Sequence, residues 1–217
     1  MKPLLICDCD EVLLHMVRHF RTWLGEHHAI DMTLGDGNLM AGMKRRDGGP
    51  VPREELWQLL DGFFPVEMAR QTLVPHAREG LARIAAVADI VILTNLGDHC
   101  RVARIEQLAA HGIEHRVECN QGGKGEPVRR LMAEHGDPVT VFVDDLAVHH
   151  ESVARHAPAA HRLHMISEPE LAAGTPPAPA AHARIDDWVE AADWILARFA
   201  SGAPAEESAL SPAGGDR

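Results

Sequence analysis

The chain has 217 residues, of which 46% are hydrophobic and 24% charged, enough for one large domain or a core with a smaller insertion. Its formal net charge of −11 argues against a broad surface for nucleic acid or an anionic membrane, because phosphate groups attract basic faces. A small anionic substrate remains compatible with this charge, since a local cation inverts the field within one pocket.

The cysteines and the N-terminal segment indicate a cytoplasmic protein. Cys7, Cys9, Cys100 and Cys119 form no CxxC pair, so we expect reduced thiols. The opening stretch MKPLLICDCDE becomes acidic before the apolar core of a signal peptide is reached. No apolar run approaches membrane-spanning length, so no membrane partner is expected.

Apolar runs alternate with helical patterns along most of the chain. Buried parallel strands are expected over residues 4–7, 89–93 and 139–143, and helices over residues 78–87, 100–111 and 126–135. Another helix, a short strand near residues 163–166, a Pro/Ala loop and a final helix over residues 185–199 follow. This alternation predicts a three-layer α/β domain around a parallel sheet.

An extra segment separates the first two strands. Residues 15–75 contain two amphipathic helix patterns, HMVRHFRTWLGEHH and PREELWQLLDGFF, on either side of a Gly-rich middle. Such a segment is too long for a simple connection and predicts a small, mostly helical insertion above the carboxyl edge of the sheet. We therefore divide the chain into a core of residues 1–14 and 76–200, this insertion, and a mobile tail of residues 201–217.

Polar side chains follow the predicted strands at the points where the strands end. They are Asp8 and Asp10, then Thr94 and Asn95, then Asp144 and Asp145, with Lys124 on the turn QGGKGEP. Ligands of open α/β sheets bind beyond the carboxyl ends of the strands, so we expect these side chains at one edge.

The acids at this edge predict a site for a hard cation. Asp8 and Asp144 are suited to share Mg²⁺, which takes oxygen ligands and retains several waters. Such an ion offsets the clustered negative charge, and Thr94 and Lys124 are suited to hold the oxygens of a phosphate group. The ligand expected from this pattern is a small phosphorylated molecule.

Four motifs in this order resemble the haloacid dehalogenase-like hydrolase superfamily, in its phosphatase branch. They are LLICDCDEV, VILTN, GGKGEPV and VFVDD, and the resemblance extends from residue 4 to about residue 153. It implies a Rossmann-like core, and the insertion resembles the type 1 helical cap of that superfamily.

The resemblance also implies a reaction. Asp8 would attack phosphorus to form an aspartyl-phosphate, and Asp10 would protonate the leaving alkoxide and then activate water. Thr94 and Lys124 would stabilise the transferring phosphoryl group, with Asn95 beside them in substrate binding.

The implied metal site draws on the same acids. Mg²⁺ would be bound by Asp8, the backbone carbonyl of Asp10, and Asp144, with Asp145 helping through water or a more distant contact. A helix-capping role for Asp145 is an equal alternative.

Other functions of the same superfamily remain open. A phosphomutase shares the first half-reaction, whereas a dehalogenase would lack the second aspartate, so Asp10 favours phosphate-ester hydrolysis. Glu11 stands where the family often has glycine, and His149 or His150 stands where it often has asparagine. These departures leave room for a binding or regulatory protein without turnover.

Simpler interpretations accompany several of these residues. A lysine between glycines, as at Lys124, is more often a surface residue. The histidines show no zinc-binding spacing. The aromatic residues Trp23, Trp57, Phe63 and Phe64 are more often the insertion's own core than a substrate pocket. The sequence predicts neither the substrate nor the oligomeric state.

Overall fold

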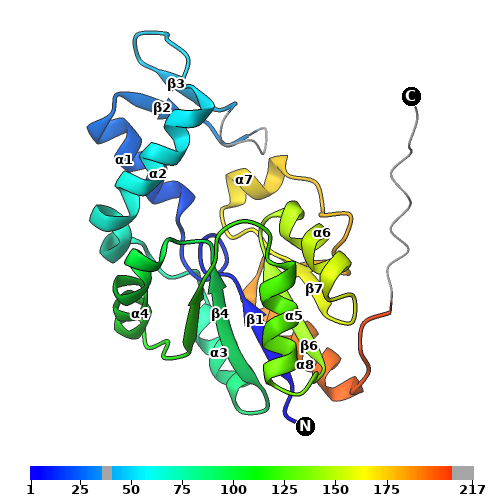
Figure 1. Ribbon diagram of the computed structural model, residues 1–217. Coiled ribbons are helices and arrows are strands. Elements are labelled where there is room, and N and C mark those ends of the chain that lie inside the picture. The colour runs from blue at the N-terminus through cyan, green and yellow to red at the C-terminus, as the bar shows by residue number, and fades with distance from the viewer. Residues whose placement is uncertain (36–40, 207–217) are drawn as a thin grey trace, which may run out of the picture.

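The computed structural model describes residues 1–35 and 41–206, and a parallel sheet between layers of helices forms its larger part (Figure 1). The strands of this sheet are β1 (Leu4–Cys7), β4 (Asp89–Thr94), β5 (Arg116–Cys119), β6 (Thr140–Asp144), β7 (His161–His164) and β8 (Ala183–Arg184). In the described part of the chain they lie side by side in the order β5-β4-β1-β6-β7-β8, and each neighbouring pair is parallel. The expected three-layer α/β class is confirmed.

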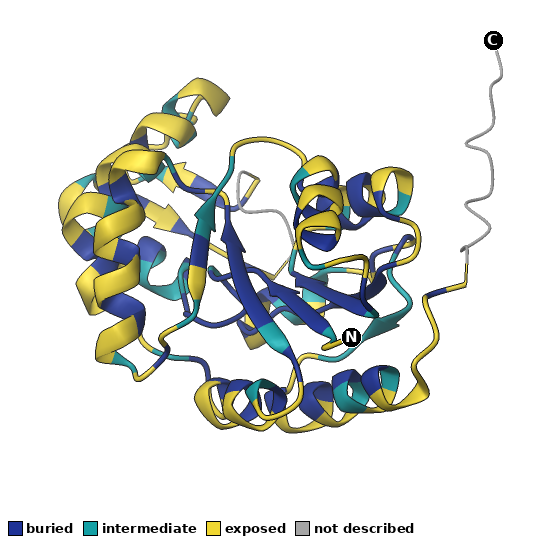
Figure 2. Ribbon diagram, turned by 60° about the horizontal axis from the view of Figure 1, so that its bottom comes forward, coloured by how far each residue is buried: buried dark blue, intermediate teal, exposed yellow. Residues whose placement is uncertain are grey.

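The helices of this unit cover both faces of the sheet, whose central strands are buried (Figure 2). They are α3 (Ala77–Ala85), α4 (Arg101–Ala110), α5 (Gly125–Glu134), α6 (Ala147–His156) and α8 (Trp188–Ser201), with a 3₁₀ turn η2 (Asp98–Cys100). The short helix α7 (Pro169–Gly174) packs Leu171 with residues of the segment between β1 and α3 instead. Alternate residues of β1 point to opposite faces. Leu4 and Ile6 pack with side chains of α5 and α6, whereas Leu5 and Cys7 pack with side chains of α3 and α8.

The segment between β1 and α3 forms its own small body at the top of Figure 1. Its elements are α1 (Val17–His27), β2 (Ile30–Met32), β3 (Met43–Arg45), α2 (Arg53–Glu67) and the 3₁₀ turn η1 (Met68–Arg70). The antiparallel pair β2–β3 accompanies the two expected helices. Phe20, Trp23 and Phe63 lie at the centre of its hydrophobic cluster, which also takes in Ile166 and Leu171 from the chain after β7.

The insertion leaves and rejoins the core at neighbouring points. The backbone N–H of His15 donates to the carbonyl of Thr72 at 2.9 Å, and that of Val74 donates to the carbonyl of Leu13 at 2.8 Å. The two linkers therefore run side by side. Both lie close to the loop that follows β1.

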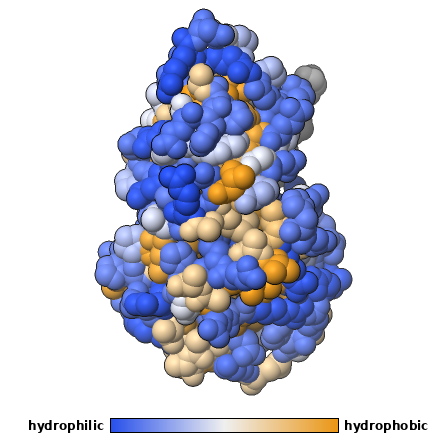
Figure 3. Space-filling model, turned by 90° about the vertical axis from the view of Figure 1, so that its left-hand side faces the viewer, coloured by the Kyte–Doolittle hydropathy of each residue, from blue (hydrophilic) through white to orange (hydrophobic). Residues whose placement is uncertain are grey.

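The helix α4 buries an unexpected set of side chains. Arg104 and Gln107 are buried together with Leu108, whereas Val102 and Ile105 are 66% and 42% exposed. Figure 3, which faces the side of the molecule carrying α2 and α4, shows hydrophobic patches near the junction of the insertion and the core. The polar face of α4 is therefore the one that meets the protein interior.

Two further observations concern the ends of the chain. Within the described ranges, none of the helices is both long and apolar enough to cross a membrane. Of the tail expected over residues 201–217, Ser201 still belongs to α8 and the N–H of Ala205 donates to the carbonyl of Ala159 at 3.0 Å. Residues 207–217, like residues 36–40 of the Gly-rich middle of the insertion, lie outside the described residues.

Candidate active site

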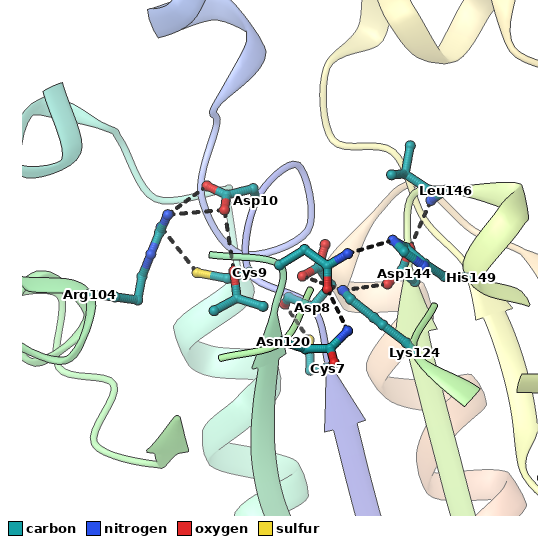
Figure 4. A network of polar contacts seen from close by, with 12 residues as sticks. Cys7, Asp8, Cys9, Asp10, Arg104, Asn120, Lys124, Asp144, Leu146 and His149 are labelled. Carbon is teal, nitrogen blue, oxygen red and sulfur yellow. Dashed lines mark hydrogen bonds and ion pairs between the residues drawn. The ribbon is translucent and has the colours of Figure 1, made fainter. Parts of the chain in front are cut away.

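The polar residues at the carboxyl ends of β1, β4 and β6 meet at one edge of the sheet (Figure 4). The strand β1 lies between β4 and β6, and Cys7 is in register with Ile92 and Val143. Asp8 follows Cys7 directly, so the sheet holds it between the end of β4 and the end of β6.

Lys124 joins the acid that follows β1 to the acid that ends β6. Its Nζ atom lies 2.7 Å from Oδ1 of Asp8 and 2.7 Å from Oδ2 of Asp144, and the lysine is 1% exposed. The helix that follows Lys124 begins at Gly125, where a Cβ atom would lie 2.2 Å from the carbonyl oxygen of Ser152 on α6. A glycine at this position lets α5 approach α6 closely enough for Lys124 to reach both carboxylates.

The electrostatics of this cluster follow from burial and from its single lysine. Burial, with Asp144 and Asp10 nearby, raises the pKa of Asp8 to about 7, although Lys124 opposes the shift. Burial acts in the same direction on Asp144, yet Lys124 prevails and lowers the pKa of Asp144. Burial followed by the charges of Asp144 and Asp8 raises the pKa of Asp145 well above its usual value. The single positive charge of Lys124 is therefore too small to offset the negative charges of three ionised carboxylates.

Two histidines hold the backbone of the acidic pair. A ring nitrogen of His150 lies 3.0 Å from the carbonyl oxygen of Asp144, and a ring nitrogen of His164 lies 2.8 Å from that of Asp145. In both histidines the nitrogen is Nε2, and it donates its hydrogen to the carbonyl oxygen. At the start of α6, the N–H of Leu146 donates to Oδ1 of Asp144 at 2.9 Å. The described residues give α6 no side-chain cap at its N-terminus, so the capping role that was an alternative for Asp145 is not seen.

Thr94 and Asn95 face different parts of the site. The hydroxyl of Thr94, which is fully buried, donates to Oδ2 of Asp10 at 3.4 Å. The side-chain nitrogen of Asn95 donates to the carbonyl of Gly122 at 2.9 Å and lies 3.3 Å from Nε2 of His149. His149 therefore contacts the residue after Thr94.

Asp10 is held by a residue that the sequence analysis did not identify. Nη2 of Arg104 lies 2.9 and 3.0 Å from the two carboxylate oxygens of Asp10, and this arginine is fully buried. Nε2 of Gln71 donates to Oδ1 of the same aspartate at 3.4 Å. Asp10 thus points toward α4 and the returning linker of the insertion, away from the Lys124 cluster in Figure 4.

Glu11 supports the first helix of the insertion. Its φ angle is 60°, a left-handed conformation that explains why glycine suits this position. Oε1 of its buried carboxylate accepts from the N–H of Val17 at 2.5 Å, and Oε2 accepts from the hydroxyl of Ser167 at 3.1 Å. Burial raises the pKa of Glu11 to about 7. The residue links the loop after β1 to the start of α1 and to the chain after β7.

The aromatic residues of the insertion have separate roles. Trp23 and Phe63 are buried in its hydrophobic cluster, and Trp57 is 61% exposed. The ring centroid of Phe64 lies 5.8 Å from Cζ of Arg104. Phe64 is therefore the aromatic residue of the four that contacts the candidate site's surroundings.

The acidic cluster has a donor set suited to a hard divalent ion. Asp8, Asp144 and Asp145 each offer one carboxylate oxygen, and these oxygens lie within 4.8 Å of one another. Carboxylate oxygen is the ligand type that Mg²⁺ takes in proteins. The raised pKa values of Asp8 and Asp145 indicate that further positive charge would stabilise their ionised forms. The side chain of Asp10 is engaged by Arg104, and the ligand expected from this residue is its backbone carbonyl.

Comparisons with solved structures identify the fold. No protein-family description matches the chain, and no curated protein does. A haloacid dehalogenase-like hydrolase from Streptococcus pneumoniae is similar, with a TM-score of 0.60 and 10% identity over 90% of this chain and 98% of the other. A predicted phosphoglycolate phosphatase from Haemophilus somnus has a TM-score of 0.61 and 13% identity over 88% of this chain and 97% of the other.

A third similar structure, a haloacid dehalogenase-like hydrolase from Xanthomonas campestris, has a TM-score of 0.56 and 14% identity over 93% of this chain and 97% of the other. At such identities the likeness concerns the fold. The chain has the fold of the haloacid dehalogenase-like hydrolases, as its four motifs predicted.

Proposed function

We propose that the protein is a Mg²⁺-dependent phosphatase that hydrolyses a small phosphorylated metabolite through an aspartyl-phosphate. The observation that carries this proposal is the buried contact of Lys124 with both Asp8 and Asp144, beside Asp145. A cluster with three carboxylates and one ammonium group is suited to a phosphate group accompanied by a divalent ion. The similar structures described as hydrolases and as a phosphatase support this reaction class.

In the first step, a carboxylate oxygen of Asp8 forms a bond to phosphorus while the bond from phosphorus to the leaving oxygen breaks. Asp10 donates a proton to that leaving oxygen. Lys124 and Thr94 hold the phosphoryl oxygens, on which negative charge is concentrated during transfer.

In the second step, a water molecule attacks the phosphorus of the aspartyl-phosphate, and Asp10 accepts a proton from it. The bond between phosphorus and Asp8 breaks, which restores the Asp8 carboxylate and releases inorganic phosphate. Asp8, Asp144 and Asp145, with the backbone carbonyl of Asp10, would hold Mg²⁺, which supplies charge neutralisation for phosphate oxygens. The insertion would cover this edge of the sheet and exclude bulk water and large substrates.

The test is hydrolysis of 4-nitrophenyl phosphate with MgCl₂ and with excess chelator, by the wild type, Asp8→Asn and Asp193→Asn. The matched control is Asp193, an exposed aspartate that pairs with Arg83 and is not among the residues of the candidate site. We expect metal-dependent turnover in the wild type and the control and none in Asp8→Asn. Full activity of Asp8→Asn, or no turnover by the wild type, would contradict the proposal and favour a binding protein with this fold.

A further inference from the structure

Arg104 is a buried charged residue without a place in the reaction steps above. It lies on α4, its side chain is 0% exposed, and its guanidinium group contacts both oxygens of Asp10. A buried guanidinium group is costly unless carboxylates and other acceptors surround it. Its position beside a residue that transfers protons therefore calls for a functional explanation.

The contacts of Arg104 join three segments of the chain. Nη1 donates to Sγ of Cys9 at 3.3 Å, in the loop after β1, and to Oε1 of Gln71 at 3.4 Å, in the linker that returns from the insertion. The ring of Phe64, near the end of α2, lies against the guanidinium group. One side chain of α4 thus contacts the loop that carries Asp10 and two parts of the insertion.

Gln107, one helical turn further along α4, strengthens the link to the insertion. Its side-chain nitrogen donates to Oε1 of Gln71 at 3.1 Å and to the carbonyl of Met68. Gln71, which is 1% exposed, in turn donates to Asp10. Arg104, Gln71 and Asp10 consequently form a closed set of contacts, in which each member touches the other two.

We propose that Arg104 is a positioning residue that, together with Gln71, fixes the carboxylate of Asp10 for proton transfer and makes its placement depend on the returning linker of the insertion. This role rests on the proposed phosphatase function. The two oxygens of Asp10 contact the same guanidinium nitrogen, which sets the direction of the carboxylate. Gln71 donates to Oδ1 and Thr94 to Oδ2, and these two contacts set its plane. Displacement of a reacting group by about 1 Å lowers a rate by about a hundredfold.

A positioning role predicts an effect that depends on the substrate. General acid catalysis contributes about a hundredfold or more to a rate, and most where the leaving group is a poor one. Phenyl phosphate and 4-nitrophenyl phosphate differ by one ring substituent, but 4-nitrophenolate leaves readily without a proton and phenolate does not. Misplacement of Asp10 should therefore slow the hydrolysis of phenyl phosphate more.

The experiment compares kcat/KM for these two substrates in the wild type, Arg104→Gln, Arg104→Lys and Gln71→Ala. For each substrate, kcat/KM reports the steps up to formation of the aspartyl-phosphate, in which Asp10 acts as the acid. We expect Arg104→Gln to lose about tenfold more kcat/KM on phenyl phosphate than on 4-nitrophenyl phosphate. Arg104→Lys and Gln71→Ala should also lose more kcat/KM on phenyl phosphate than on 4-nitrophenyl phosphate, but by a smaller factor. KM for 4-nitrophenyl phosphate should change little.

Arg101→Gln is the matched control, because Arg101 lies on the same helix and is exposed. Its ratio of the two kcat/KM values should equal that of the wild type. An equal loss on both substrates in Arg104→Gln and Gln71→Ala would overturn the positioning role and leave a structural one. If Arg104→Gln does not fold, Arg104→Lys and Gln71→Ala decide by the same criterion. A wild type without turnover on either substrate would instead overturn the proposed function, and the positioning role with it.

Discussion

The Nζ atom of Lys124 lies 2.7 Å from Oδ2 of Asp144, and both side chains are buried. Burial alone would lower the pKa of Lys124, yet the neighbouring carboxylates of Asp144 and Asp8 raise it, so the ammonium form is retained. The lysine consequently stabilises the acidic cluster in addition to its proposed contact with phosphate. Its removal should affect the fold even before any substrate is added.

The first prediction concerns Lys124→Met. The substitution leaves Asp8 and Asp144 buried without their cation, which costs about 3–5 kcal/mol in the free energy of unfolding. Added MgCl₂ should restore part of this loss, because a divalent ion binds the folded cluster in preference to the unfolded chain. Urea denaturation with and without MgCl₂ measures both effects. Lys44→Met, at an exposed lysine, is the control, and equal stability of the two variants would contradict this account.

A second prediction concerns the ion pair between Asp10 and Arg104. Asp10→Asn leaves a buried guanidinium group without its carboxylate, so we expect a loss of about 3–5 kcal/mol in the free energy of unfolding. The double variant Asp10→Asn/Arg104→Met should be more stable than the sum of the single effects predicts, by about 1 kcal/mol or more. Denaturation of the four proteins of this cycle provides the measurement. Strict additivity would show that the two side chains do not interact in solution.

The third prediction separates the backbone of Glu11 from its carboxylate. Both Glu11→Gly and Glu11→Ala remove the acceptor for the N–H of Val17 and should lower stability. Alanine must also adopt the left-handed backbone conformation seen at this residue, at a cost of about 1 kcal/mol relative to glycine. Thermal unfolding should therefore rank the wild type above Glu11→Gly and Glu11→Gly above Glu11→Ala. The reverse order of the two variants would exclude the left-handed conformation.

The fourth prediction is a pH dependence of stability at His182. Burial, followed by the nearby Arg162, lowers the pKa of His182 from 6.5 to about 4, and its Nδ1 atom accepts from the N–H of Arg162 at 2.9 Å. The unfolded chain thus binds a proton at a higher pH than the folded protein does. The contribution of His182 is complete above pH 6.5 and declines as the pH falls from 6.5 to about 4.

His182→Asn keeps an acceptor near the position of Nδ1 and has no proton to gain. Chemical denaturation between pH 7 and pH 4 should show a shallower loss of stability for this variant than for the wild type. Histidines away from this position, such as His150, titrate alike in both proteins, so the difference reports His182 together with His161, whose ring packs against it. Parallel curves would refute the assignment.

The central strands could be predicted from the sequence because their residues are apolar on both faces. The structure places β1 over the expected residues, extends β4 by one residue at its end, and shifts β6 by one residue toward the C-terminus. The edge strand β5 was missed. Its sequence, RVEC, has the exposed Arg116 and only one fully buried apolar residue, so no apolar run marks it.

The site could be predicted in part, and for a related reason. Asp8, Asp144 and Lys124 each follow a recognisable strand or turn, and the sheet topology then brings them together. Arg104 has no such marker, because an arginine within a helix is usually solvated. A weak signal was present, since Arg104 precedes the buried Leu108 by four residues and so shares its helix face. Only the tertiary packing of α4 against the insertion reveals its contact with Asp10.

The paired linkers of the insertion have a consequence for the evolution of such proteins. Leu14 and Leu73 form an antiparallel bridge, so the two linkers that connect the insertion to the core are adjacent. A segment attached in this way can be lengthened, shortened or exchanged for another without a change in the order of the strands. The insertion can thus diversify among related proteins while the residues at the carboxyl edge of the sheet are retained.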